Sequence, residues 1–282
     1  MTQRTRISIT IHAALAIIFA TGTGFRGAAM NGEEIFDESE ERHGLTSEIA
    51  IIKMVVLDNQ GNVDTREVLR AFHTGKDGSD YSLLRFRSPE PVKGVALLSV
   101  LKKGSEDLQY LYMPALGNIR QISGSSKKGY FMGTDFAYED LHPEDTSRYK
   151  YSRALDDAVD GVDCYLVTAR PIDKEIENES RYTKRQLWIS KDDLRILRID
   201  FYHTENQLLK TLRSTEFRSV SEGGIAERPI RMEMTHHANK TSSMFVVTKG
   251  IYDAELTEAF FSVESLKDWP ADSEKDIFGA LQ

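Results

Sequence analysis

From Ser47 onward, apolar and polar positions alternate along the chain in short runs. In residues 197–202, for example, Leu197, Ile199 and Phe201 share one face of an extended chain. A period of two predicts half-buried antiparallel strands. We expect strands over residues 47–58, 65–75, 81–88, 94–102, 108–114, 163–170, 183–190, 197–202, 229–236 and 243–252.

Turn signals separate these runs. Asn59-Gln60-Gly61-Asn62 is a hairpin signal between the first two strands. About ten to twelve strands with regular turn signals favour one large meander or barrel over a parallel sheet. No repeat or low-complexity tract divides the chain, so a single domain is expected over residues 30–282.

Helical patterns are few. Asn31 can cap a short helix over residues 31–44, with Glu34 at the capping-box position and Gly44 at a left-handed stop. Two other segments, 129–141 and 256–266, have apolar residues without a strand pattern. A sheet this wide cannot always fill its own interior, so these short pieces or an apolar ligand must cover its apolar face.

The first residues differ from the rest of the chain. Arg4 and Arg6 precede an apolar stretch over residues 7–20, and small residues follow up to Ala29. This order predicts a secretory signal peptide over residues 1–29, cleaved near Ala29, and the apolar run is short for a bilayer span. An uncleaved anchor is the alternative. After cleavage, no stable insertion into a membrane is expected.

Charge and cysteine content narrow the function classes. Without residues 1–29, 33 Lys and Arg stand against 44 Asp and Glu, a net charge of −11. An acidic protein is repelled by phosphate backbones, so nucleic acid is not an expected partner. Cys164, the only cysteine, lies within a strand pattern, where a small buried side chain is a better interpretation than a catalytic thiol.

Candidate catalytic and metal-binding groups do not form a recognised pattern. Asp135, Glu139, Asp140 and His142 could form an acidic cluster, but their spacing is wrong for a calcium loop. Acids at a helix N-terminus or solvated loop charges explain them better. His236 and His237 are adjacent in a strand and point to opposite faces, so they cannot chelate one metal. We predict no catalytic residue, no metal site and no cofactor.

Methionines are placed on apolar strand faces and in the 129–141 segment. They are Met113, Met132, Met232, Met234 and Met244. Flexible thioether side chains tolerate ligands of variable shape, although ordinary core filling also explains them.

The segment YLYMPALGNIRQISGSSKKGYFMGTDFAYEDL, residues 110–141, closely resembles the LolA-like outer-membrane lipoprotein-sorting proteins of Gram-negative bacteria. It has a Tyr-Leu-Pro-like strand end, a basic strand and a Phe-x-Gly-Ser/Thr-Asp-Phe turn that ends in Tyr-Glu-Asp-Leu. Residues 84–98, LRFRSPEPVKGVALL, are similar to the family's Phe-x-x-Pro-x-x-x-x-Gly strand pair. The likeness runs from about Gly44 to Leu266.

This resemblance implies an incomplete, unclosed β-barrel folded over a hydrophobic cavity, with short helices as a lid, in the periplasm. We therefore expect a mainly β, non-enzymatic carrier that binds a lipid or a lipoprotein acyl chain, with an inner-membrane transporter as a possible partner. The alternative is an accessory module that docks a partner membrane protein, such as a lipid-exporting pump, through the same half-barrel. An enzyme that uses the acidic cluster ranks third.

Two groups of residues are expected to form the binding site. The expected lining residues are Leu84, Phe86, Met113, Leu197, Phe201, Ile230, Met232, Met234 and Met244. The expected flap over the cavity is formed by Phe131, Met132, Gly133, Asp135, Phe136 and Tyr138.

Overall fold

The computed structural model describes residues 30–102, 107–143, 145–221, 224–256 and 258–267. The expected signal peptide and its cleavage site at Ala29 lie outside the described residues. The strands are β1 (Ser47–Leu57), β2 (Val63–Thr74), β3 (Asp80–Ser88), β4 (Ala96–Leu101), β5 (Leu108–Met113), β6 (Asn118–Gln121), β7 (Tyr149–Arg153), β8 (Asp157–Val159), β9 (Val162–Pro171), β10 (Lys184–Ser190), β11 (Ile196–Thr204), β12 (Gln207–Ser219), β13 (Glu227–His236) and β14 (Thr241–Tyr252).

Helices are short by comparison. The α-helices are α1 (Gly32–His43) and α2 (Lys174–Glu179), and the 3₁₀ turns are η1 (Glu90–Val92), η2 (Pro114–Leu116), η3 (Gly124–Lys128), η4 (Tyr138–Leu141), η5 (Thr146–Arg148), η6 (Glu258–Phe261) and η7 (Glu264–Leu266). Among the described residues, no helix is both long and apolar enough to cross a membrane.

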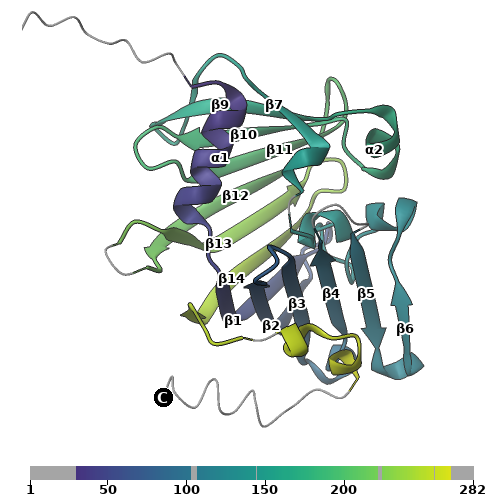
Figure 1. The fold of residues 1–282 in the computed structure, drawn as a ribbon. Coiled ribbons are helices and arrows are strands. Elements are labelled where there is room, and N and C mark those ends of the chain that lie inside the picture. Colours follow the sequence, from purple (N-terminus) through teal and green to yellow (C-terminus); the bar gives the residue numbers. More distant parts are fainter. Residues whose placement is uncertain (1–29, 103–106, 144, 222–223, 257, 268–282) are drawn as a thin grey trace, which may run out of the picture. The chain divides into compact units, whose positions relative to one another are not determined.

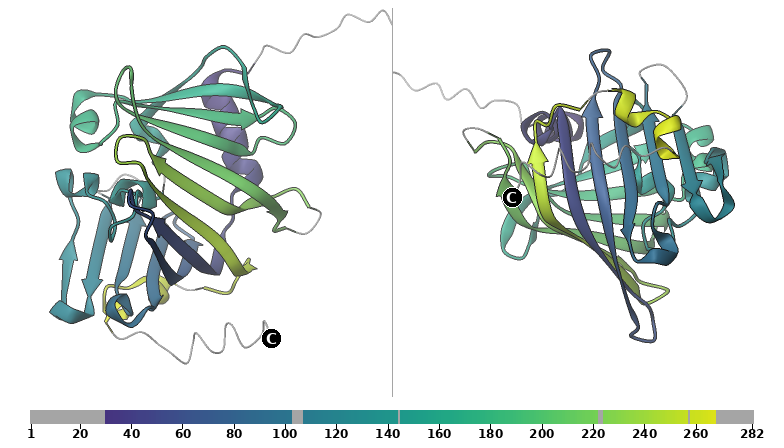
Figure 2. Two further views of the ribbon diagram at one scale, coloured as in Figure 1. Left: turned by 180° about the vertical axis from the view of Figure 1, so that it is seen from behind. Right: turned by 90° about the horizontal axis from the view of Figure 1, so that it is seen from below.

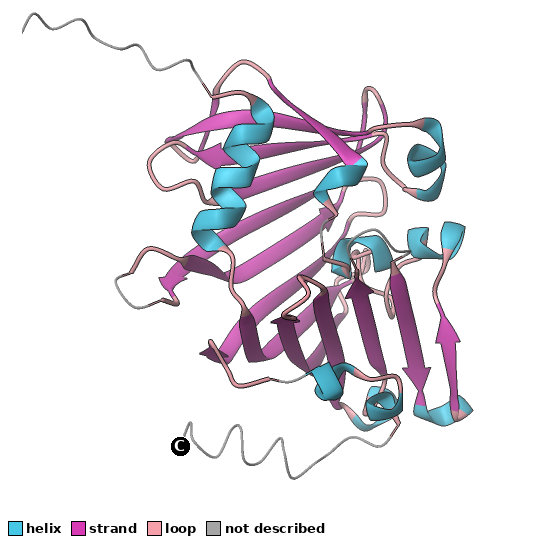
Figure 3. Cartoon of the chain, viewed as in Figure 1, coloured by secondary structure: helices cyan, strands magenta, loops and turns pink. Residues whose placement is uncertain are grey.

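All the strands join one antiparallel sheet (Figure 1, Figure 3). Its order is β6-β5-β4-β3-β2-β1-β14-β13-β12-β11-β10-β9-β7, with β8 paired to β9. In the described part of the chain β6 and β7 are the two ends, and they do not pair with each other. The strands near the two ends run in clearly different directions in Figure 2, as the twist of a wide sheet requires. The expected unclosed half-barrel is therefore confirmed.

The first hairpin forms as predicted. Gly61 has a φ of +87° in the turn between β1 and β2, a conformation that glycine adopts without a steric penalty. The strand β12, in contrast, was missed, because its alternation includes Lys210 and Ser214 at positions that face the interior of the sheet.

Both faces of the first strands are apolar. On β3, Leu84 and Phe86 belong to a cluster that includes Phe201 of β11 and Phe245 of β14. We call this side of the sheet the inner face, because its cluster joins residues from both ends of the sheet. Leu83, on the outer face, belongs to a separate cluster that covers β1–β4 from the other side.

Helix α1 packs against β7, β9 and β10 and lies across the neighbouring strands in Figure 1. Its N-terminus has the predicted capping box, in which Asn31 accepts hydrogen bonds from the helix and Glu34 accepts one from the Asn31 N–H. Phe36 stacks on Tyr151 of β7 with ring centroids 4.4 Å apart. The left-handed stop at Gly44 was wrong. Its φ is −62°, and glycine is needed because a Cβ would lie 2.6 Å from the Glu40 carbonyl oxygen.

The segment after β14 covers the outer face. Leu256, Phe261 and Leu266 pack on the outer cluster, and Phe261 lies 5.7 Å from the ring of Tyr81. Residues 256–266 therefore do not plug the inner face, which is left to α1 and to residues 129–141.

Candidate functional site

The loop of residues 129–141 lies on the inner face of the sheet. Phe131 stacks on Phe86 of β3 at 5.6 Å, and Phe136 stacks on Phe245 of β14 at 4.3 Å. Both loop phenylalanines are buried. The loop thus contacts strands from two separate parts of the sheet. We call it the inner loop.

Backbone hydrogen bonds give the inner loop a tight hairpin shape. The Phe131 N–H donates to the Phe136 carbonyl at 2.8 Å, and the Tyr138 N–H donates to the Gly129 carbonyl at 2.9 Å. At its tip, Met132 and Gly133 have φ values of +48° and +75°. Glycine adopts this left-handed conformation readily, so Gly133 allows the sharp reversal between the two phenylalanines.

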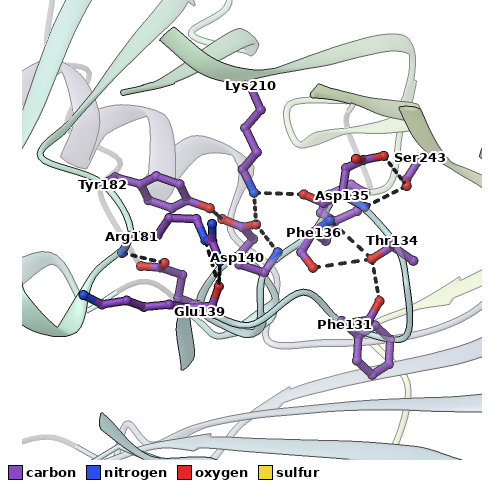
Figure 4. A network of polar contacts seen from close by, with 12 residues as sticks. Phe131, Thr134, Asp135, Phe136, Glu139, Asp140, Arg181, Tyr182, Lys210 and Ser243 are labelled. Atoms are coloured by element: carbon purple, nitrogen blue, oxygen red, sulfur yellow. Dashed lines mark hydrogen bonds and ion pairs between the residues drawn. The ribbon is translucent and has the colours of Figure 1, made fainter. Parts of the chain in front are cut away.

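Lys210 of β12 points from the sheet onto the inner loop (Figure 4). Its side chain is fully buried, and its Nζ lies 2.5 Å from Oδ2 of Asp140 and 2.9 Å from the Asp135 carbonyl oxygen. The Tyr182 hydroxyl donates to Oδ1 of Asp140 at 2.7 Å, and the Ala137 N–H donates to Oδ2. A buried ion pair is compatible with the fold when further hydrogen bonds satisfy the charges, as they do here.

Asp135 ties the same loop to β14. Its carboxylate accepts hydrogen bonds from the hydroxyls of Thr241 and Ser243, and its N–H donates to the Ser243 Oγ at 2.8 Å. Asp135 and Lys210 therefore attach the loop to two different strands of the inner face.

Glu139 joins the loop to the segment before β10. It accepts hydrogen bonds from the Ser180 hydroxyl at 2.7 Å and the Arg181 N–H at 2.9 Å. Burial, and next the neighbouring Asp140 carboxylate, raise the pKa of Glu139 to about 7. Burial and the same carboxylate raise the pKa of Tyr182 well above its ordinary value, so its hydroxyl stays a hydrogen-bond donor.

These contacts change the interpretation of the acidic cluster. The carboxylates of Asp135 and Asp140 are buried and hydrogen-bonded, so they are not solvated loop charges, whereas Asp140 does lie in the first turn of the 3₁₀ helix η4, as the alternative of acids at a helix N-terminus expects. His236 lies on the inner face beside Tyr130, whereas His237 contacts the Thr211 hydroxyl. In the part of the chain that the structure describes, no group of three or more His, Cys, Asp or Glu side chains is placed to hold a metal ion.

Two cavities lie beside the inner loop and α1. The first has a volume of about 430 Å³ and the second about 210 Å³. Apolar residues of the sheet and the loop form one side of the first cavity: Leu84, Phe136, Leu141, Leu212, Met232 and Phe245. The second cavity lies between α1 and the sheet and includes Ile199, Phe217 and Val247. Glu40, Arg70, Arg228 and Met232 line both, so the two cavities adjoin.

The predicted lining residues fall into distinct groups. Leu84 and Met232 line the first cavity. Phe86, Phe201 and Met234 are buried in the inner cluster, and Met113 packs against it. Ile230 is buried two residues before Met232 in β13.

Two other residues of that group face away. A register shift in the pairing of β10 with β11 skips Leu197, which then packs with Trp188 and Cys164. Such a bulge moves a side chain to the opposite face of a sheet. Met244 lies between Ser243 and Phe245, which are on the inner face, so it points to the outer side. The structure therefore separates Leu197 and Met244 from the cavities.

The residues that sequence reasoning missed are mostly charged. Lys210, Arg70 and Arg228 all lie on the inner face, where the strand pattern predicts apolar side chains. The one sequence signal that could have identified these residues is a Lys or Arg at a strand position that the alternation assigns to the inner face.

Comparisons with known proteins place the chain in context. Residues 78–268 match a protein family described as "Uncharacterized protein". An outer membrane lipoprotein-sorting protein domain from Vibrio parahaemolyticus is 31% identical, with a TM-score of 0.77 over 84% of this chain and 98% of its own. A DUF1329 family protein from Desulfovibrio piger is 27% identical, with a TM-score of 0.76 over 83% and 96% of the two chains.

A more distant structure has the same fold. A LolA superfamily protein from Nitrosomonas europaea is 18% identical, with a TM-score of 0.65 over 84% of this chain and 99% of its own. No match was found among proteins with curated descriptions.

Proposed function

Because the chain belongs to the LolA-like family of outer-membrane lipoprotein-sorting proteins, we propose that it is a periplasmic carrier without catalytic activity. Its cargo would be a lipoprotein acyl chain or another lipid, bound on the inner face of the half-barrel. It would transfer this cargo rather than catalyse a reaction.

The first cavity is the observation that carries this proposal. Its volume of about 430 Å³ is within the range of small-molecule sites. Leu84, Met232 and Phe245 supply an apolar wall from three different strands, and Phe136 of the inner loop adds to it. An acyl chain would bury its methylenes against this wall.

The energetics suit a reversible carrier. Each buried methylene contributes roughly 0.8 kcal/mol. A chain of about ten methylenes gains about 8 kcal/mol, which corresponds to micromolar affinity before the ordering cost of binding is subtracted. Binding of this strength still permits release to an acceptor.

The inner loop controls access in this proposal. Phe136 and Leu141 lie over the first cavity, while Asp135 and Asp140 hold the loop to β14 and β12. Cargo that enters from the loop side displaces these contacts, so loop movement sets the rate of loading and release.

The test combines extraction and cavity filling. Mass spectrometry after organic extraction of protein purified from the periplasm should detect a co-purified lipid. Met232→Trp places a bulky ring in the cavity and should abolish binding of a fluorescent fatty acid. Met244→Trp, on the outer side of the neighbouring strand, is the matched control and should bind as the natural protein does.

Two results would overturn the carrier. One is a correctly folded natural protein that neither retains nor binds any lipid. The other is equal binding by the Met232→Trp and Met244→Trp variants, which would place the lipid outside the first cavity.

A further inference from the structure

Two arginines stand at the junction of the two cavities. Arg70 projects from β2 and Arg228 from β13, and both line the first and the second cavity. These strands are separated in the sheet by β1 and β14. The two guanidinium groups therefore reach the same place from opposite sides.

One carboxylate lies between them without binding either closely. Arg70 Nη1 is 3.9 Å from Oε1 of Glu48, and Arg228 Nη2 is 3.6 Å from Oε2. Both distances exceed a hydrogen bond. The Glu48 side chain is only 3% exposed, yet its Oε2 has no hydrogen-bond partner among the described residues.

The guanidinium groups keep unused donors. Among the described residues, neither the Arg70 nor the Arg228 guanidinium donates a hydrogen bond to a protein atom. Each guanidinium has five N–H donors, which need partners when they are withdrawn from water. Their side chains are 23% and 31% exposed, and the cavities are the surfaces that they line. Burial and the charge of Arg70 lower the pKa of Arg228, which an added anion would reverse.

Lys210 is an example of a buried charge whose hydrogen-bonding capacity is satisfied by neighbouring groups. Lys210 has two oxygen acceptors within 2.9 Å, and Asp140 has three donors. The junction of Arg70, Arg228 and Glu48 has no comparable set of contacts. Glu40 of α1, an exposed residue that lines both cavities, adds a second negative charge near Arg228.

We propose that Arg70 and Arg228 bind the anionic head group of an amphiphile, a carboxylate or a phosphate, while its apolar chain occupies the first cavity along Leu84 and Met232. Guanidinium groups bind both anions through paired hydrogen bonds, and two of them from separate strands fix the position of the head group. Glu48 lies between the two guanidinium groups and offsets part of their mutual repulsion. The assignment rests on the proposed carrier function and adds the class of its cargo.

The first experiment needs no substitution. Isothermal titration of the natural protein at pH 8 compares laurate and dodecyl phosphate with dodecanol, which has the same chain and no charge. We expect the two anions to bind at least tenfold more tightly than dodecanol. Inorganic phosphate and acetate, which have no chain, should bind at least a hundredfold more weakly than the amphiphiles.

The second experiment uses matched variants. Arg70→Gln and Arg228→Gln should each weaken laurate binding about tenfold and leave dodecanol binding unchanged. Arg231→Gln, in the same strand as Arg228 but paired with Glu233, is the control and should change neither. Glu48→Gln removes the competing carboxylate and should strengthen laurate binding.

The outcomes separate the two proposals. If no amphiphile binds, the carrier function fails and this inference fails with it. If laurate and dodecanol bind equally, the carrier stands and the head-group site is overturned. Tight binding of inorganic phosphate alone would assign the arginines to a free anion, which also overturns the proposal.

Discussion

Nζ of Lys210 lies 2.5 Å from Oδ2 of Asp140, and the two side chains are 0% and 4% exposed. The pair joins β12 to the end of the inner loop, 70 residues away in the chain. Among the described residues it is a deeply buried charge pair, and it is one of the contacts that attach the inner loop to the sheet.

Replacing Lys210 should therefore destabilise the protein strongly. Lys210→Met leaves the Asp140 carboxylate buried without its cation, and breaking a buried pair in this way costs about 3–5 kcal/mol. Urea denaturation followed by tryptophan fluorescence measures the loss. Lys174→Met, at an exposed site on α2, is the control and should leave the midpoint nearly unchanged.

The double variant Lys210→Met/Asp140→Asn should recover part of that loss, because no uncompensated charge remains. A double variant no more stable than Lys210→Met would mean that packing around the lysine stem, not the charge pair, holds the loop.

Stability should fall as the pH rises through neutrality because of Glu139. Its pKa is raised to about 7 in the folded protein, so the folded state holds this proton more tightly than the unfolded chain does. The contribution is complete below pH of about 4.5 and is lost as the pH rises through about 7. The loss is on the order of 2 to 3 kcal/mol between pH 5 and pH 8.

Glu139→Gln should remove this part of the pH dependence, since glutamine does not titrate. The measurement is the free energy of unfolding of both proteins at pH 5 and pH 8. Glu175→Gln, on the exposed side of α2, should keep the full pH dependence. Parallel curves for the natural protein and Glu139→Gln would contradict the assignment.

Gly133 should tolerate asparagine better than alanine. Its φ is +75°, and no atom lies within 4 Å of an added Cβ, so any cost is conformational rather than steric. Alanine in this region costs about 1–2 kcal/mol, while asparagine enters it more readily. Thermal unfolding of Gly133→Ala and Gly133→Asn compares the two. A larger loss for asparagine would show that the tip of the loop is constrained by something other than its backbone.

Cys164 should not react with a thiol reagent in the folded protein. The residue is fully buried beside Trp188, and burial raises the pKa of its thiol. Both effects suppress the reactive thiolate. Ellman's reagent should give no colour in native buffer and one equivalent in urea. Rapid reaction of the native protein would place the thiol at the surface.

The regular parts of the fold could be predicted from the sequence, because they depend on local patterns. The alternation along β3, β10 and β13 and the capping box at Asn31 are properties of neighbouring residues. Residues 110–141 also resemble the LolA-like proteins closely enough to indicate an unclosed barrel. None of these inferences needed a contact between distant segments.

The parts that failed depend on distant contacts. Lys210 interrupts the apolar face of β12, and the Asp140 carboxylate and the Asp135 carbonyl oxygen make a buried lysine acceptable there. By simple alternation Leu197 should lie on the same face as Phe201, but a register shift between β10 and β11 places it on the other face. Arg70 and Arg228 meet at one place only because the sheet bends, which no local pattern encodes.

The separation of β6 from β7 has a mechanical consequence. In a closed barrel, the strand number and the stagger of the strands fix the radius, so its interior cannot swell without breaking hydrogen bonds. In the described part of this chain no ladder joins the two end strands, and that restriction is absent. The sheet can open or tighten through small changes in twist while every existing ladder stays intact, which would let the proposed carrier accept cargo chains of different width.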